Sequence, residues 1–346
     1  MKITMQDVAD AVGVSRMTIS NAYSRPDKLS AALRERIFEA ARTLGYTGPD
    51  AAARAFARGS TGVVGIILTD TPAEAFVDEV AVSLMAAIAD QLADRGLAMA
   101  LVPGRVTADR VPARDLALDG AIGYGCSADS AAFGLMIGRR VPLVTVDQPP
   151  VDGVPAVNID DYGGARQAAE HLARLGHRRV AAVTVAMDQD VAGHAAERLR
   201  GWRDGLADRE LQVAARPGTL TEAHGYELAR SVLDSPERPT AVVCFSDTAA
   251  LGVLRAADDV GLSVPEDLSV VGFDDSTAAA RAGLSTVHQD VPAKGRAAVQ
   301  ALYEVMDADD TAAADPNPRI LLPTQLTPRT STAPPRRPAA PDRSGR

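Results

Sequence analysis

The sequence of 346 residues is poor in cysteine and in aromatic side chains, and it has no long apolar run. Its two cysteines, Cys126 and Cys244, lie far apart without C-x-x-C spacing or a histidine cluster, so we expect buried free thiols rather than a metal or redox site. No run approaches the roughly 18 to 20 apolar residues that a membrane span requires. The N-terminus has one Lys and no apolar segment, so we expect no signal peptide.

The motifs of common catalytic sites are also absent from the sequence. It contains no G-x-S-x-G elbow, no P-loop and no G-x-G-x-x-G motif that opens a first helix. The five histidines, at positions 171, 177, 194, 224 and 288, have no metal-binding spacing. We therefore expect no metal, no cofactor and no catalytic residues.

Charge is distributed unevenly along the chain. The net charge is −9, which argues against a generally basic nucleic-acid binder. Residues 1–60, however, contain nine Lys and Arg against six Asp and Glu, and residues 329–346 contain five Arg against one Asp. A basic head on an acidic body is typical of a DNA-binding domain joined to a part that does not bind DNA.

Residues 4–24 have the pattern of two short helices joined by a tight turn. Thr4 and Asp7 have the spacing of a capping box, and Gly13 can adopt the left-handed backbone that ends a helix. Ser15 is a natural N-cap for the second helix, whose outer face is polar. Such a pair suits the major groove of DNA, because one face packs while the other carries polar side chains toward bases and phosphates. The alternative is an ordinary helical hairpin with a solvated polar face.

The remainder of the chain changes character twice. Ser30 is expected to cap a third helix, Ala31 to Leu44, and the short Ala-rich segment 51–58 lies in a linker that we expect to be helical only when something supports it. From Val63, apolar strands alternate with amphipathic helices, which predicts two successive doubly wound α/β units with parallel sheets. The Pro-, Ala- and Arg-rich segment from about Arg329 is predicted to be disordered.

Five stretches of the chain share the pattern of one known family. They are Thr4 to Asn21, Leu44-Gly-Tyr46, Gly176-His-Arg-Arg-Val180, Glu197-Arg-Leu-Arg-Gly-Trp202 and Ser269-Val-Val-Gly-Phe-Asp-Asp275. With these stretches in this order and spacing, over about residues 3 to 328, the chain resembles the LacI/GalR (lac repressor/purine repressor) family of bacterial transcription regulators. The resemblance implies an α/β fold: a helix-turn-helix head and hinge, then a two-lobed periplasmic-binding-protein-like body.

The resemblance also implies domain boundaries. The head would span residues 1–46, the hinge 47–60, the body 61–328 and a disordered tail 329–346. The chain would cross between the lobes near residues 160, 288 and 317. Lobe 1 would then contain about residues 61–160 and 289–317, including the helix predicted at 293–306, and lobe 2 about residues 161–288 and 318–328.

In the head and hinge, the resemblance assigns DNA contacts to three groups of residues. Bases would be read by Arg16, Met17 and Asn21; phosphates would be bound by Thr4, Ser15, Thr18, Ser20 and Ser30; and the hinge would enter the minor groove with Ala53, Arg54 and Phe56. Two positions depart from the family. Its best-known members have Arg where Asn21 stands, and the family has a leucine wedge where Phe56 stands. The alternative for Phe56 is packing on the body.

The resemblance further places an effector site in the cleft between the lobes. Its predicted residues are Asp274, Arg198, Asp147, Ser246, Asp247 and Phe76. Asp274 directly follows a strand, at the carboxyl end where α/β sheets bind ligands. Carboxylates with an arginine suit a polyhydroxylated ligand such as a sugar. The alternative is that polar residues at strand ends only cap helices and turns.

Together these features predict a cytoplasmic, nucleoid-associated repressor. It would bind a pseudo-palindromic operator in double-stranded DNA as a homodimer, under the control of a small-molecule effector, without contact with a membrane. Two other classes of protein match parts of the sequence. A periplasmic sugar receptor shares the body's fold, but the head and the expected lack of a signal peptide argue against it. An enzyme on an α/β scaffold is disfavoured by the missing catalytic motifs.

Overall fold

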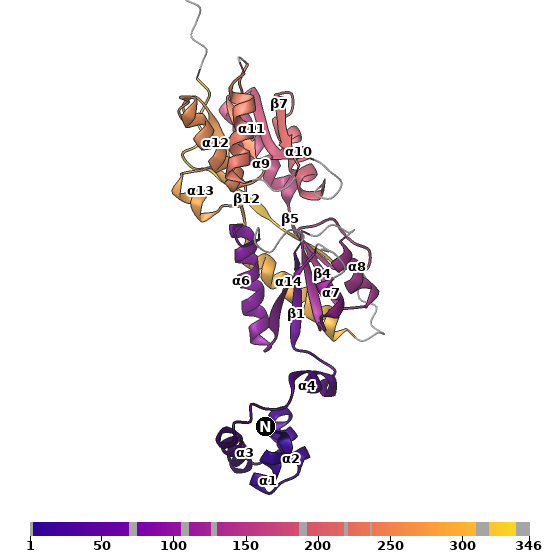
Figure 1. Cartoon of the computed structure of the whole chain (residues 1–346). Coiled ribbons are helices and arrows are strands. Elements are labelled where there is room, and N and C mark those ends of the chain that lie inside the picture. The colour runs from indigo at the N-terminus through magenta and orange to yellow at the C-terminus, as the bar shows by residue number, and fades with distance from the viewer. Residues whose placement is uncertain are drawn as a thin grey trace, which may run out of the picture. The chain divides into compact units, whose positions relative to one another are not determined.

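The computed structural model describes residues 3–68, 75–104, 111–125, 130–186, 192–217, 221–235, 237–308 and 318–336. The chain divides into two compact units, Met1–Gly62 and Val63–Arg346 (Figure 1). No helix within the described ranges is long and apolar enough to cross a membrane. Cys244 is buried and free, and Cys126 lies outside the described residues.

The first unit begins with the predicted helix-turn-helix. Its elements are α1 (Met5–Val12), α2 (Arg16–Ser24), the 3-10 helix η1 (Pro26–Lys28), α3 (Ala31–Leu44) and α4 (Ala51–Arg58). The expected caps are confirmed: Thr4 and Asp7 form a capping box, and the oxygen of Ser15 accepts a hydrogen bond from the Thr18 amide. Gly13 ends α1 in the left-handed region, at a φ of 76°. A small core joins the three helices, made of Val8, Ala9, Ile19, Ala22, Ile37 and Ala41.

The linker after α3 differs from the sequence expectation. Residues 51–58 form the helix α4 in the chain alone, where we expected a helix only with support. Asp50 supplies part of the reason, because its Oδ1 accepts a hydrogen bond from the Ala53 amide at 3.1 Å and so caps the helix. Gly48 precedes it at a φ of 108°, where a Cβ would lie 3.3 Å from the Tyr23 ring, so both the backbone and the space there favour glycine.

The second unit contains the two predicted α/β lobes, and the predicted fold class is confirmed. The first lobe has a fully parallel six-stranded sheet in the order β11-β5-β4-β3-β1-β2. Apolar cores cover both faces, one with α6 and α14 and the other with α7 and α8. Its strands are β1 (Val63–Leu68), β2 (Ala98–Pro103), β3 (Gly120–Tyr124), β4 (Leu143–Val146), β5 (Ala156–Ile159) and β11 (Arg319–Leu322); its helices are α6 (Glu79–Asp94), α7 (Pro112–Asp115), α8 (Ala131–Gly138) and α14 (Val291–Asp307).

The second lobe has a parallel four-stranded sheet in the order β7-β6-β8-β9. One core packs α11 and α12 against this sheet, and another packs α9 and α10 against the opposite face. Its strands are β6 (Arg179–Val185), β7 (Glu210–Arg216), β8 (Ala241–Cys244) and β9 (Ser269–Val271); its helices are α9 (Asp161–Leu175), α10 (Ala192–Leu206), α11 (Glu222–Leu233), α12 (Asp247–Asp259) and α13 (Thr277–Arg281).

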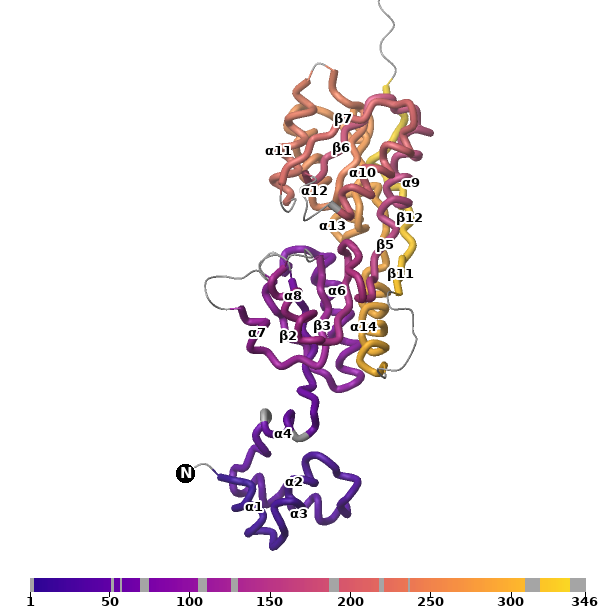
Figure 2. Tube along the Cα trace, turned by 90° about the vertical axis from the view of Figure 1, so that its right-hand side faces the viewer, coloured from indigo at the N-terminus to yellow at the C-terminus, as the bar shows by residue number. Residues whose placement is uncertain are grey.

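The chain crosses between the lobes three times, beside an antiparallel pair of strands, β10 (Thr286–Gln289) and β12 (Thr324–Thr327). The first crossing is at Asp160, between β5 and α9, and the second is at Asp290, between β10 and α14. The predicted third crossing, near 317, is wrong. Strand β11 still pairs with β5 through Leu322, and the chain leaves at Pro323, because proline has no amide hydrogen with which to continue the ladder. Figure 2 shows β5, β11 and β12 along one side of the body.

The predicted disorder of the tail is wrong for residues 329–336, whereas residues 337–346 lie outside the described residues. The Val270 amide of β9 donates to the Ser331 carbonyl at 2.9 Å, and the Ser331 amide donates to the Gly283 carbonyl at 3.1 Å. The tail therefore pairs the Val270 amide on the outer edge of β9, beside the bridge between Val271 and Ser285. The Pro-, Ala- and Arg-rich composition of this segment is typical of disorder, but it does not show hydrogen bonds to residues far away in the sequence.

Ser331 tests this docking. Its buried hydroxyl donates to the Val270 carbonyl at 2.6 Å and accepts from the Ser285 amide at 2.8 Å. Ser331→Ala leaves two buried backbone groups unpaired, so we expect the free energy of unfolding in urea to fall by about 1–3 kcal/mol. Thr330→Ala is the comparison variant: it removes only an exposed bond from the Thr330 hydroxyl to the Gly283 carbonyl at 3.2 Å, so it should lower the free energy of unfolding by less than Ser331→Ala does. Equal stability of the two variants would contradict the docked tail.

Candidate DNA-reading surface and effector site

The outer face of α2 carries the predicted base-reading residues. Ile19 and Ala22 are buried in the head core, whereas Arg16 is exposed and Met17 is 69% exposed. Asn21 is half-buried one turn after Met17, so the two lie on the same side of the helix. The local sequence explains this orientation, because the Ser15 cap fixes where the helix begins and hence which side chains face the core.

Four of the five predicted phosphate contacts lie at helix N-termini. Thr4, Ser15 and Ser30 are the N-caps of α1, α2 and α3, and Thr18 bonds the Ser15 hydroxyl at 2.9 Å. Helix N-termini attract anions through their free amide groups and the helix dipole. Ser20 is half-buried on α2. The geometry is compatible with phosphate binding, which stays a prediction for all five residues.

Helix α4 presents the predicted hinge residues. Phe56 is 92% exposed, the most exposed large apolar side chain among the described residues, while Ala53 is exposed and Arg54 half-buried. A bare phenyl ring in water is unfavourable and is stabilised by any apolar surface that covers it. The minor-groove role of these three residues stays a prediction.

Arg198 of α10 is held on several sides within the second lobe. Its Nε donates to Asp161 Oδ1 at 2.7 Å, and its guanidinium carbon lies 3.6 Å from the ring centroid of Phe273. It also donates to the carbonyl of Phe245. Sequence reasoning missed Asp161, which also bonds His194 Nδ1 at 2.8 Å and so neutralises much of the local positive charge.

Asp274 has an uncommon backbone conformation at the end of β9. Its φ is 117° and that of Asp275 is 61°, a conformation that costs about 1–3 kcal/mol per residue outside glycine. The Asp274 amide donates to the Val287 carbonyl at 2.8 Å, and its Oδ1 accepts from Gln289 Nε2 at 2.8 Å. Burial raises the pKa of Asp274 well above its usual value. Strain and burial at one carboxylate are typical of a functional residue.

Asp147 occupies the corresponding place in the first lobe, after β4, at a φ of 49°. Its Oδ2 accepts from Lys294 Nζ, whereas Oδ1 is buried without a hydrogen-bond partner among the described residues. Lys294 Nζ also donates to Gln289 Oε1 at 2.8 Å. Lys294 and Gln289 therefore bring Asp147 and Asp274 into one network. The only signal for this network in the sequence was a lysine within the apolar, buried stripe of α14.

Ser246 and Asp247 are bound to neighbouring backbone and side-chain groups of the second lobe. Ser246 caps α12 by accepting from the Ala249 amide, and Asp247 is 1% exposed. The carboxylate of Asp247 accepts from the Ser276 amide at 2.7 Å and from Thr286 Oγ1 at 2.6 Å. For Asp247 these bonds favour the alternative weighed for it, helix capping and turn stabilisation, whereas an effector contact of Ser246 stays a prediction.

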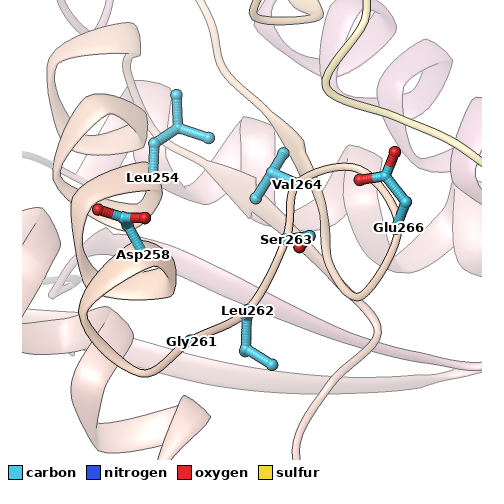
Figure 3. A pocket seen from close by; sticks show the side chains of 7 residues that line it. All are labelled: Leu254, Asp258, Gly261, Leu262, Ser263, Val264 and Glu266. Carbon is cyan, nitrogen blue, oxygen red and sulfur yellow. The ribbon is translucent and has the colours of Figure 1, made fainter.

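Two further features lie on the surface of the body. Phe76, which precedes α6, is 57% exposed, and its effector contact stays a prediction. A depression of about 540 Å³ lies between the end of α12 and the following loop, with Asp258 and Glu266 on opposite sides (Figure 3). It contains none of the predicted effector residues, so we do not assign it to the effector. No cluster of three His, Cys, Asp or Glu within the described ranges is arranged to hold a metal.

The head and the paired lobes define the class: a helix-turn-helix protein with a ligand-binding body. Residues 4–48 match the family model of bacterial regulatory proteins, lacI family, and residues 169–332 match a periplasmic binding protein-like domain. The chain is 34% identical, over 87% of its length and 90% of the relative's, to an HTH-type transcriptional regulator of Mycolicibacterium smegmatis. It is 31% identical to the HTH-type transcriptional regulator IpsA of Corynebacterium glutamicum, over 96% and 98% of the two chains.

Solved structures agree with this assignment. The transcriptional regulator CelR–cellobiose complex is 29% identical and has a TM-score of 0.69, covering 95% of this chain and 99% of that one. The lac repressor dimer bound to operator and the anti-inducer ONPF has a TM-score of 0.80 at 24% identity, over 96% and 100% of the chains, which supports the fold. The protein belongs to the lacI family of bacterial regulatory proteins and is a DNA-binding transcription regulator.

Asp247 gives a test of this buried arrangement. Burial raises its pKa to about 6, so between about pH 4 and 6 the native protein holds a proton that the unfolded chain has released. This group therefore makes the native state less stable as the pH rises through that window. Asp247→Asn removes the titration, so the stability of the wild type relative to this variant should fall from pH 4 to 6.5 in urea unfolding. Asp258→Asn, at an exposed carboxylate of the same helix, is the control. A flat difference would contradict the buried carboxylate.

Proposed function

We propose that this protein is a cytoplasmic repressor that binds a pseudo-palindromic operator as a homodimer and responds to a small molecule in its body. The observation that carries the proposal is the division of α2 into a buried face and an outer face with Arg16, Met17 and Asn21. A second copy of this helix, related by twofold symmetry, would read the other half-site. The proposal assigns the chain no catalytic activity.

Each predicted reader has its own chemistry. The Arg16 guanidinium can donate two hydrogen bonds to O6 and N7 of a guanine, while Met17 can contact only a thymine methyl or a base face. Asn21 can pair with adenine or bond a phosphate. Phe56 would enter the minor groove as a wedge at the operator centre, where its ring is larger than the family's leucine.

The effector is proposed to be an uncharged, hydroxyl-rich molecule such as a sugar. Arg198 is already paired with Asp161, and Lys294 with Asp147, so Asp274 is a carboxylate without a cationic partner in hydrogen-bond contact among the described residues. Such a carboxylate accepts hydroxyl donors and repels anionic ligands. The CelR–cellobiose complex provides a related regulator with a bound sugar.

Arg16→Ala should remove operator specificity and leave weak, salt-sensitive binding. Loss of a bidentate guanine contact predicts a drop of about 5- to 150-fold in discrimination between the operator and a sequence altered at that base pair. Fluorescence anisotropy on the two duplexes measures this ratio. Arg16→Lys is the matched control, because it keeps the charge but not the bidentate geometry, so it should retain the salt-dependent affinity and lose discrimination. Unchanged discrimination in both variants would remove Arg16 from the reading set.

Asp274→Ala should leave operator binding intact and abolish the response to effector. A thermal-shift screen of sugars and related metabolites on the wild type first identifies a stabilising ligand by mass action. Operator release or retention with that ligand is then measured for the wild type, for Asp274→Ala and for Asp258→Asn as control. A normal response of Asp274→Ala would refute its role as an effector residue.

A further inference from the structure

Lys294 is a lysine that the body buries completely. It lies near the start of α14 with 0% exposure, and its Nζ donates to Asp147 in the first lobe. The same Nζ donates to Gln289 Oε1 at 2.8 Å, and Gln289 Nε2 donates to Asp274 Oδ1 in the second lobe at 2.8 Å. A continuous series of hydrogen bonds, Asp147–Lys294–Gln289–Asp274, therefore joins the two lobes through the residue before the second crossing.

Core stability alone does not explain a charge at this position. The neighbouring positions Val291, Ala298 and Val299 on α14 are buried among apolar side chains of the first lobe. Replacing a buried ion pair by apolar side chains of similar volume is often neutral or stabilising, because burial removes both charges from water. The lysine therefore points to a polar task that an apolar residue cannot perform.

That task follows from the direction of the hydrogen bonds. An ammonium group only donates, so the Gln289 amide must turn its oxygen toward Lys294. The amide nitrogen is then turned toward Asp274, where a donor stabilises the ionised carboxylate. Without Lys294 the amide is free to reverse, and its oxygen would then accept a hydrogen bond from protonated Asp274.

We propose that Lys294 is a positioning residue of the effector site, which acts through Gln289 to set the orientation and the charge state of Asp274. The inference rests on the proposed effector role of Asp274. It deepens that role by naming what prepares the carboxylate to accept ligand hydroxyls and what links it to Asp147 in the other lobe.

The charges around Asp274 make its ionisation sensitive to this one donor. Burial favours the protonated form of Asp274, and the nearby carboxylates Asp247 and Asp78 favour it too. The Arg198 guanidinium and the hydrogen bond from Gln289 favour the ionised form. Tyr124, at the end of β3, also interacts electrostatically with Asp274. Removal of Lys294 should therefore raise the pKa of Asp274 further.

The test needs no ligand. For a carboxylate with a raised pKa in the native state, the stability of the wild type relative to Asp274→Asn falls as the pH rises and levels off above the native pKa. We expect the levelling-off to move to higher pH, by about one unit or more, when the same difference is measured in a Lys294→Met background. Four proteins are compared: the wild type, Asp274→Asn, Lys294→Met and the double variant Lys294→Met/Asp274→Asn. The stability of each is measured by urea unfolding of the full-length chain between pH 4 and 9.

Two further variants keep the result interpretable. Gln289→Glu keeps the bond to Lys294 but replaces the donor to Asp274 by a second acid, so it should move the levelling-off in the same direction. If Lys294→Met does not fold, Asp147→Asn/Lys294→Met removes both buried charges and serves as the background. If Lys294 is merely structural, its removal lowers the stability by the same amount at every pH. The pH at which the stability difference levels off then stays the same in the Lys294→Met and Asp147→Asn/Lys294→Met backgrounds, and this result would overturn the inference.

The outcomes separate this inference from the proposed function. A normal effector response of Asp274→Ala would refute the effector role of that residue whatever the pH curves show. Loss of that response, together with pH curves that neither Lys294→Met nor Gln289→Glu moves, would overturn only the role of Lys294.

Discussion

The body depends on three chain crossings that hold two separately cored lobes together. The first and third are tied to each other: the Asp160 amide donates to the Leu322 carbonyl at 2.8 Å, and Thr324 Oγ1 donates to the Asp160 carbonyl at 2.8 Å. The second crossing begins at Asp290, which caps α14. Beyond the crossings, a polar contact also joins the lobes: Glu79 accepts from the amide and hydroxyl of Thr277 at 3.0 and 2.6 Å.

Each polar contact of this kind contributes only about 0.5–3 kcal/mol to stability, so a bound ligand can shift the equilibrium between arrangements of the two lobes. The proposed effector residues Arg198 and Asp274, together with their bonding partners, lie beside the crossings. Asp161 follows the first, Gln289 precedes the second, and Asp274 pairs with the strand that leads to it. A molecule bound there contacts the elements that connect the lobes.

In the proposed function, control of DNA binding requires a hinge element whose folding is easily shifted. Helix α4 has eight residues, a length that is marginal for an isolated helix, and its Phe56 ring is almost fully exposed. Its formation is therefore sensitive to small changes in free energy. In the proposed mechanism, burial of Phe56 in the minor groove stabilises this helix, and the body either permits or opposes that arrangement.

The ends of the helices in the head could be predicted from the sequence. Thr4, Ser15 and Ser30 cap helices, and Gly13 ends one, because capping depends on a few neighbouring residues. Bonds between distant parts of the sequence were not predictable. The pairing of β11 with β5, the docking of Ser331 on β9 and the contact of Lys294 with Asp147 each join residues that only the folded chain brings together. Asp247 was predicted as an effector contact because a carboxylate at a strand end looks the same whether it binds a ligand or Thr286.

The most direct test of the account is selection of genomic DNA fragments by the full-length protein at modest ionic strength, with and without a panel of small metabolites. The account predicts enrichment of one sequence with twofold symmetry, and a change in that enrichment with at least one metabolite. Recovery of no preferred duplex under any of these conditions would contradict it.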